Sequence, residues 1–176
     1  MVRRAKAIKL SVDNIDNVLE RSLDVDALER GAIRPLLLTQ NVATVVARFC
    51  ASHASAGRFK LTLPDRLTVA VDADILVLIL KNLLDNAVKY SPRNSDIFVV
   101  MTADDTEFFV RVSNVSSHVL PASEQLFTKY YRAPRAMSVS GMGLGLYWVG
   151  TVVKMLKGTI VYSTENDLVV FTLCLP

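Results

Sequence analysis

The stretch ADILVLILKNLLDNAVKYSP, residues 73–92, constrains the fold more than any other part of the sequence. Its apolar residues recur at intervals of three and four, which predicts a long amphipathic helix. Asp72 or Asp74 can cap the start of this helix, and Pro92 requires it to end before that residue. The apolar face of such a helix needs a partner, and the residues on either side of it indicate a sheet.

Strand patterns occur on both sides of the helix. Alternating apolar residues predict two short strands around Pro64, a strand pair folded at residues 103–106, and a final hairpin after residue 158. Two more helices are predicted, one from residue 39 to Gly57 and one from Leu144 to Leu156 with Gly158 as its C-cap. This succession predicts an α+β sandwich in which helices cover one face of a sheet.

The first 30 residues follow a different pattern. Their apolar side chains step by four and three along a narrow seam, at Ile8, Val12, Ile15 and Leu19. Such a seam pairs one helix with another, and Gly31 with Pro35 would end the helix. We therefore expect a stalk helix and linker over residues 1–30, weak dimerisation through that helix, and a separate domain over residues 31–176.

Composition excludes several classes of function. The net charge is only +3, and the basic residues near the start alternate with apolar ones, so nucleic-acid binding is not expected. No apolar run approaches the ~20 residues needed to cross a bilayer, so no membrane contact is expected for these residues, and a membrane anchor of the intact protein would lie outside them. Cys50 and Cys174 match no metal-ligand spacing, which favours buried thiols in a reducing, cytoplasmic compartment.

The polar face of the long helix carries amides. At ~100° per residue, Asn82, Asn86 and Lys89 fall within an arc of ~60°. Asparagine is a poor helix former, so a merely solvated face would more often carry Glu, Lys or Arg. An amide oxygen can bind a magnesium ion whose charge is balanced by phosphates, and a lysine can contact the remaining anionic oxygens. The face therefore predicts a site for a nucleoside triphosphate with its Mg²⁺.

A second phosphate signal is the stretch GMGLGL, with Gly141, Gly143 and Gly145 on alternate positions before a helix. Glycines let backbone N–H groups approach a phosphate, and a helix start adds unpaired donors and a positive dipole end. The same glycines could also form only a turn. The glycines fit neither a Rossmann nor a Walker motif, because a long loop at residues 115–139 precedes them instead of a strand and no Gly-Lys-Ser/Thr occurs. A loop of this length, with one helical turn near residues 123–127, is typical of a lid.

In chain order, LILKNLLDNAVKYSP, LFTKYYRAP and GMGLGLYWVGTVVKMLKG resemble the N, F and G2 boxes of the ATP-binding domain of sensor histidine kinases, in the GHKL ATPase superfamily. The resemblance covers about residues 36–176, and residues 3–30 also resemble the end of the dimerisation and phosphoacceptor domain. It implies a Bergerat-type fold, a mixed and mostly antiparallel sheet backed by helices, with ATP held between the N-box helix and a mobile lid.

The resemblance also assigns residues by position. It implies that Asn86 binds Mg²⁺, that Lys89 and Tyr90 line the phosphates and the adenine, and that Phe127 and Arg132 belong to the lid. Asn82 stands where related ATPases such as gyrase carry a glutamate that activates water; because an amide cannot take a proton, the site is expected to preserve ATP for transfer. The G2 box adds the expected phosphate contacts Gly141, Gly143, Leu144, Gly145 and Leu146.

Two parts of the sequence depart from the family pattern. Asn114, Ser116 and His118 replace the aspartate and two glycines of the G1 box, and Leu168 and Val169 replace a usual Gly-Thr pair. The Asn114 amide can still accept a hydrogen bond from adenine, but without the charge of a carboxylate. The loss implies roughly tenfold weaker ATP binding.

The phosphoacceptor histidine is the other expected element that the chain does not show. Neither His53 nor His118 has the acidic residue and proline that normally follow it, and His53 is expected to lie on a helix surface. The leading hypothesis is a catalytic domain that passes the ATP γ-phosphoryl to a histidine on its own or a partner kinase, and from there to a response regulator. The alternative is a pseudokinase that has lost nucleotide binding and acts as an interaction module.

Overall fold

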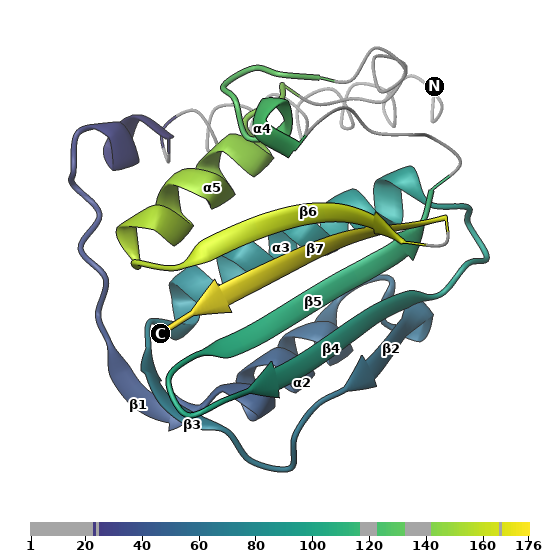
Figure 1. The fold of residues 1–176 in the computed structure, drawn as a ribbon, viewed down its shortest axis with the longest axis horizontal. Coiled ribbons are helices and arrows are strands. Elements are labelled where there is room, and N and C mark those ends of the chain that lie inside the picture. The colour runs from purple at the N-terminus through teal and green to yellow at the C-terminus, as the bar shows by residue number, and fades with distance from the viewer. Residues whose placement is uncertain (1–22, 24, 117–122, 133–141, 166) are drawn as a thin grey trace, which may run out of the picture.

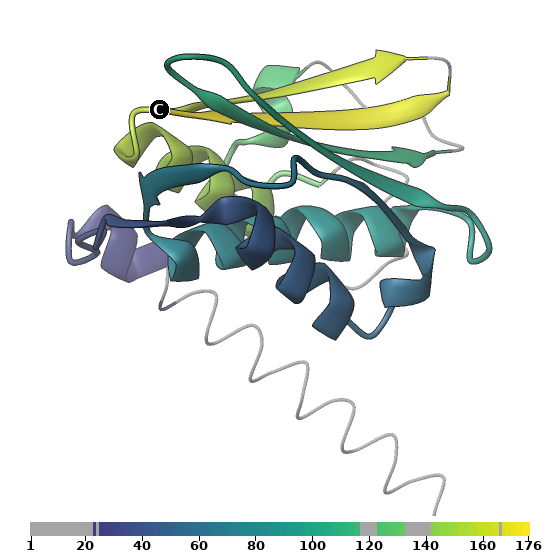
Figure 2. The ribbon, with the colours of Figure 1, turned by 90° about the horizontal axis from the view of Figure 1, so that it is seen from below.

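The computed structural model describes residues 23, 25–116, 123–132, 142–165 and 167–176. The stalk seam at residues 8–19, Gly141 and His118 therefore lie outside the described residues. Within them, the chain forms two layers, with helices packed on one face of a sheet (Figures 1 and 2). The predicted α+β sandwich is confirmed.

The main sheet has the strand order β2-β4-β5-β7-β6. Its strands are β2 (Phe59–Thr62), β4 (Ile97–Ala103), β5 (Phe108–Val115), β6 (Thr159–Glu165) and β7 (Leu168–Leu175). Strands β2 and β4 are parallel and the other neighbours are antiparallel, so the sheet is mixed and mostly antiparallel as expected. A separate antiparallel pair is formed by β1 (Leu38–Asn41) and β3 (Thr68–Val71).

Three helices cover the inner face of the sheet: α2 (Val42–Ser52), α3 (Ala73–Tyr90) and α5 (Gly145–Met155). A single turn, α4 (Ser123–Leu126), and the 3₁₀ turn η1 (Ala56–Arg58) complete the described elements. The core lies between α3 and the sheet, and its fully buried side chains include Leu76, Ile79, Leu80, Leu83, Leu84, Val99, Val110 and Leu173. Burial of this apolar face fixes which side of α3 remains polar.

Both ends of α3 are held by specific hydrogen bonds. At the N-terminus the Asp72 carboxylate accepts from the Ile75 backbone N–H at 3.0 Å, which confirms Asp72 as the cap. Beyond the C-terminus, the Arg58 guanidinium donates to the carbonyl oxygens of Pro92, at 2.8 Å, and Ser95, at 2.9 Å. It also donates to the Ser91 hydroxyl at 2.6 Å. Arg58 therefore fastens the turn that follows the predicted asparagine face.

Replacing Arg58 by alanine is expected to lower the free energy of unfolding by about 2–3 kcal/mol, because several carbonyl groups lose a charged donor. Urea denaturation provides the measurement. Arg66→Ala is the matched control, because Arg66 is exposed and its side chain donates to Thr68 at 3.3 Å. Equal losses in the two variants would show that Arg58 does not brace this turn.

The structure corrects three local predictions. Residues 39–41 form part of β1 and not the start of a helix. The helix cap is Leu156, the left-handed conformation falls on Lys157 (φ 61°), and Gly158 is needed because a Cβ there would lie 2.3 Å from the Cys174 carbonyl oxygen. His53 ends α2 instead of lying on its surface.

His53 is held by α3 and by two aromatic neighbours. Its Nε2 lies 3.1 Å from a carboxylate oxygen of Asp85, and its ring contacts Phe49 and Phe59 with centroid distances of 6.3 and 5.0 Å. The side chain is only 13% exposed. His53 is thus a packing residue that links α2 to α3.

Candidate functional site

The polar side of α3 presents the predicted residues Asn82, Asn86 and Lys89. The Asn82 amide nitrogen donates to the Leu78 carbonyl of its own helix at 2.9 Å. Asn86 is half-buried, and its side-chain amide makes no hydrogen bond to another of the residues that the structure describes. The side-chain amide of Asn86 is therefore available to a ligand on this face.

The C-terminal turn of α3 adds a charge beside an aromatic ring. Lys89 Nζ lies 5.2 Å from the centroid of the Tyr90 ring. Burial raises the pKa of the Tyr90 hydroxyl, and the charge of Arg132 opposes part of that rise. Arg132, which is far away in the sequence, therefore lies close enough to Tyr90 to act on it electrostatically.

The start of α5 is left without a side-chain cap. Leu144 occupies the cap position, and its buried, apolar side chain has no acceptor for the first backbone N–H groups of the helix. No acidic residue lies in the first turn, which contains Gly145 and Leu146. These N–H groups have no acceptor within the helix, and the dipole places positive potential there. The first turn is thus suited to an anion such as a phosphate.

Gly143 is required by its own backbone conformation and by contacts within the protein. Its φ is +72°, and a Cβ there would lie 2.4 Å from the Tyr131 carbonyl oxygen and 2.7 Å from the Tyr130 carbonyl carbon. The turn-only explanation therefore accounts for this glycine. The close approach nevertheless joins the segment at residues 128–132 to the start of α5.

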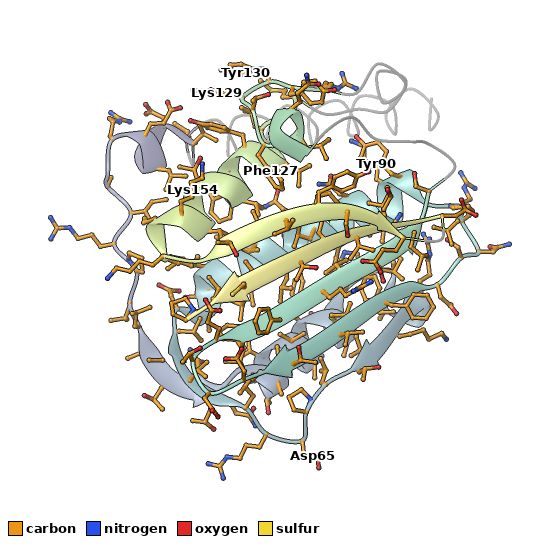
Figure 3. All side chains as sticks on the ribbon, viewed as in Figure 1. Asp65, Tyr90, Phe127, Lys129, Tyr130 and Lys154 are labelled. Carbon is orange, nitrogen blue, oxygen red and sulfur yellow. The ribbon has the colours of Figure 1, made fainter. Side chains whose placement is uncertain are left out.

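Phe127 has a packing role. Its ring lies over Gly150 of α5, where a Cβ would be 3.3 Å away, and meets Phe171 edge to face with a centroid distance of 6.4 Å. Figure 3 shows Phe127 on the α5 side of the molecule, with Lys129 and Tyr130 farther out. Phe127 thus anchors the base of the segment that carries Arg132.

Asn114 is buried, with 2% exposure, near the end of β5. Its amide nitrogen donates to the Val115 carbonyl oxygen at 3.0 Å, which leaves the amide oxygen for another partner. In the sheet it is flanked by Ile97, the first residue of β4, and by Val169 of β7. Along β5 it alternates in phase with the buried residues that face the helices.

Several of the predicted residues lie on elements that end or begin toward the same end of the domain. Helices α3 and α5 run in opposite directions on the same sheet face, so α5 starts toward the end where α3 finishes (Figure 1). The end of β5, with Asn114, and the start of β4 lie at that end too. The charge of Arg132 acts on Tyr90, at the C-terminus of α3, and Gly143 lies two residues before the start of α5.

The residue types fit a nucleotide with magnesium. Among the described residues there is no cluster of three or more His, Cys, Asp or Glu that could hold a metal ion by itself. A Mg²⁺ ion bound through one amide and the phosphates of its nucleotide needs no such cluster.

Within the described part of the chain, no helix is both long and apolar enough to span a membrane.

Comparison with known protein families gives a match over more than half of the chain. Residues 71–176 match the model of the family described as histidine kinase-, DNA gyrase B- and HSP90-like ATPases. The matched region includes α3, β5, the segment at residues 128–132 and the start of α5. The chain therefore belongs to this ATPase family.

Its relatives are sensor kinases. The sensor-like histidine kinase SenX3 of Mycobacterium tuberculosis is 28% identical over 185 residues, covering 99% of this chain and 45% of the relative. The probable sensor protein PcoS of Escherichia coli is 32% identical over 114 residues, covering 63% of this chain and 24% of the relative. The chain thus spans less than half the length of either relative.

Solved structures show the same fold at low identity. ShkA, solved at full length in complex with AMPPNP, superposes with a TM-score of 0.80 at 21% identity, over 97% of this chain and 37% of that one. The histidine kinase AdeS of Acinetobacter baumannii gives a TM-score of 0.71 at 19% identity, over 97% and 82%. The fold is therefore that of a histidine kinase ATP-binding domain.

Proposed function

We propose that this chain is the part of a sensor histidine kinase that binds Mg-ATP and delivers the γ-phosphoryl group to a histidine other than His53 and His118. The observation that carries the proposal is the convergence of the uncapped start of α5 and the amide face of α3 at one end of the sheet. ATP supplies the phosphoryl group, and the residues of the chain bind and orient it.

Each group at this end has a distinct task. The first N–H groups of α5 would bind phosphate oxygens, Asn86 would hold Mg²⁺, and Lys89 would neutralise charge on the phosphates. Arg132 would act as a bidentate donor to the γ-phosphate. This division of work uses positioning and charge neutralisation, which dominate phosphoryl transfer.

Asn82 would make the site poor at hydrolysis. Its amide cannot accept a proton from water, and its nitrogen is already used in the bond to Leu78. We expect ATP to persist in the site until an acceptor histidine reaches the γ-phosphate. A response regulator would then take the group from that histidine, and the stalk helix would pair two copies of the kinase.

Calorimetric titration of residues 1–176 with ATP in the presence of Mg²⁺ tests the proposal. We expect heat that saturates below about 1 mM ATP, which corresponds to about −4 kcal/mol or stronger binding. Absence of saturable heat would overturn the proposal and leave a protein-interaction role for the domain.

Asn114→Asp is expected to strengthen ATP binding about tenfold, because a carboxylate makes a stronger bond with the adenine amino group than an amide does. GTP carries a carbonyl at that ring position, so its affinity should not rise. Without ligand the variant should be less stable than the wild type, by about 1–3 kcal/mol, since residue 114 is buried. Calorimetry with both nucleotides measures the effect, and equal gains for ATP and GTP would remove Asn114 from the adenine site.

A further inference from the structure

Glu29 forms a contact that no motif in the sequence indicates. It is the last residue of the helical segment at residues 25–29, before the linker. Lys129 Nζ donates to both of its carboxylate oxygens, at 2.7 and 2.9 Å, and the Tyr147 hydroxyl donates to one of them at 2.8 Å. One carboxylate thus joins the helical segment to two others that lie 100 and 118 residues further along the chain.

The surroundings of the carboxylate reinforce this arrangement. Lys129 Nζ lies 5.7 Å from the ring centroids of both Tyr130 and Tyr147. The hydrogen bond from Lys129 lowers the pKa of Glu29, and the bond to Glu29 raises the pKa values of Lys129 and Tyr147. At neutral pH the acceptor is therefore charged while both donors keep their protons.

An isolated surface ion pair contributes little, but this one belongs to a network on an anchored segment. Val25 and Leu28, one turn and one residue before Glu29, are buried in the core with 3% and 7% exposure. Gly31, in the left-handed conformation, ends the segment, and the Ala32 N–H donates to the Ala27 carbonyl at 2.9 Å. The position of Glu29 therefore follows that of the helical segment.

The two partners of Glu29 lead directly to the candidate site. Lys129 precedes Tyr130 and Tyr131, whose backbone packs on Gly143, and Arg132 follows them. Tyr147 lies in the first turn of α5, where the uncapped N–H groups are. A change at Glu29 can thus reach both the arginine and the phosphate-facing turn.

We infer that Glu29 is a positioning residue that holds the segment at residues 128–132 and the first turn of α5 to the end of the N-terminal helical segment. When that segment shifts, both elements are released together, and the nucleotide site loses its ordered arginine and its fixed helix start. This coupling deepens the proposed function and depends on it for its effect on ATP.

Hydrogen exchange and calorimetry on residues 1–176 test the coupling together. In Glu29→Gln we expect the backbone amides of Tyr131 and Trp148, which donate to the Thr128 and Leu144 carbonyls, to exchange at least about fivefold faster, and ATP to bind at least about fivefold more weakly. Asp26→Asn is the matched control, because Asp26 pairs with Arg30 on the same segment and does not contact Lys129. It should leave both quantities unchanged.

Swapping the charges of residues 29 and 129 distinguishes coupling from simple loss of structure. Each single variant, Glu29→Lys or Lys129→Glu, should accelerate hydrogen exchange. The double variant should restore the exchange rates to within about twofold of the wild type. Trp148, the single tryptophan of the chain and the neighbour of Tyr147, gives a fluorescence check on the same turn.

The outcomes distinguish the two proposals. Unchanged exchange in Glu29→Gln, or a double variant no better than the single ones, would overturn the coupling whatever the affinity for ATP. Faster exchange with unaltered ATP affinity would also overturn it. A wild-type protein that binds no ATP, while Glu29→Gln still accelerates exchange, would overturn the proposed function and leave Glu29 as the residue that holds the two elements.

Discussion

Replacing Asn86 by alanine is expected to weaken ATP binding in the presence of Mg²⁺ by about 100-fold, or about 2.8 kcal/mol. Magnesium uses only one or two protein ligands beside phosphates and waters, so removing one leaves the ion without its main protein contact. Affinity measured without Mg²⁺ should barely change. Calorimetry with Mg²⁺ and with a chelator gives both values for each variant.

The control for Asn86 is another asparagine. Asn94 is exposed in the turn after α3, and Asn94→Ala should preserve both the affinity and its dependence on magnesium. The fold should survive in Asn86→Ala, because alanine favours a helix more than asparagine does. If Asn86→Ala retains the full magnesium dependence of the wild type, Asn86 is not the metal ligand.

Gly143→Ala is expected to lower the free energy of unfolding by about 3 kcal/mol. Two costs combine in this variant. An alanine at φ +72° is strained, and its Cβ would lie 2.4 Å from the Tyr131 carbonyl oxygen, so the backbone of residues 130–131 must shift. Urea denaturation measures the loss of stability.

Two other glycines separate these costs. Gly31 has a φ of +65° but nothing within 4 Å of a built Cβ, so Gly31→Ala should cost only about 1–2 kcal/mol. Gly57 has open space and no positive φ, so Gly57→Ala should stay within about 0.5 kcal/mol of the wild type. If Gly143→Ala lowers the free energy of unfolding no more than Gly31→Ala does, the close contact with the backbone of residues 130–131 does not contribute to the loss.

Sequence periodicity was sufficient for elements whose pattern is local. Helix α3 was predicted with its cap at Asp72 or Asp74 and its end before Pro92, because capping and proline sterics involve only neighbouring residues; Asp72 is the cap observed. The hairpins β4-β5 and β6-β7 followed from alternation and a turn. In each case the sequence distance between partners is short.

The sequence pattern did not predict which strands pair when the partners are far apart in the chain. Strands β2 and β3 were predicted as two short strands around Pro64, but their partners were not predicted: β2 pairs with β4 and β3 pairs with β1. Strand β1 was missed because its four residues gain their pairing only from Thr68–Val71. Gly158 was explained as a cap, while its true constraint is the Cys174 carbonyl of a strand that follows later.

The candidate site and its surroundings also contain residues that local spacing predicted and residues whose partners are too distant in the sequence to be predicted. Asn82, Asn86 and Lys89 were predicted as site residues because helical spacing places them on one face. Glu29 and Lys129 gave no signal, since nothing in either segment indicates a partner 100 residues away. Arg58 was missed for the same reason, because its acceptors lie in the turn after α3.

The most direct test of the account is a nuclear magnetic resonance titration of residues 1–176 with ATP and Mn²⁺ in place of Mg²⁺. Manganese broadens the signals of nearby groups, so one bound ion reports on α3 and α5 at once. We expect the Asn86 side-chain amide and the backbone amides of Gly145 and Leu146 to broaden at the same low ratio of ion to protein. Broadening of one set without the other would contradict a shared site.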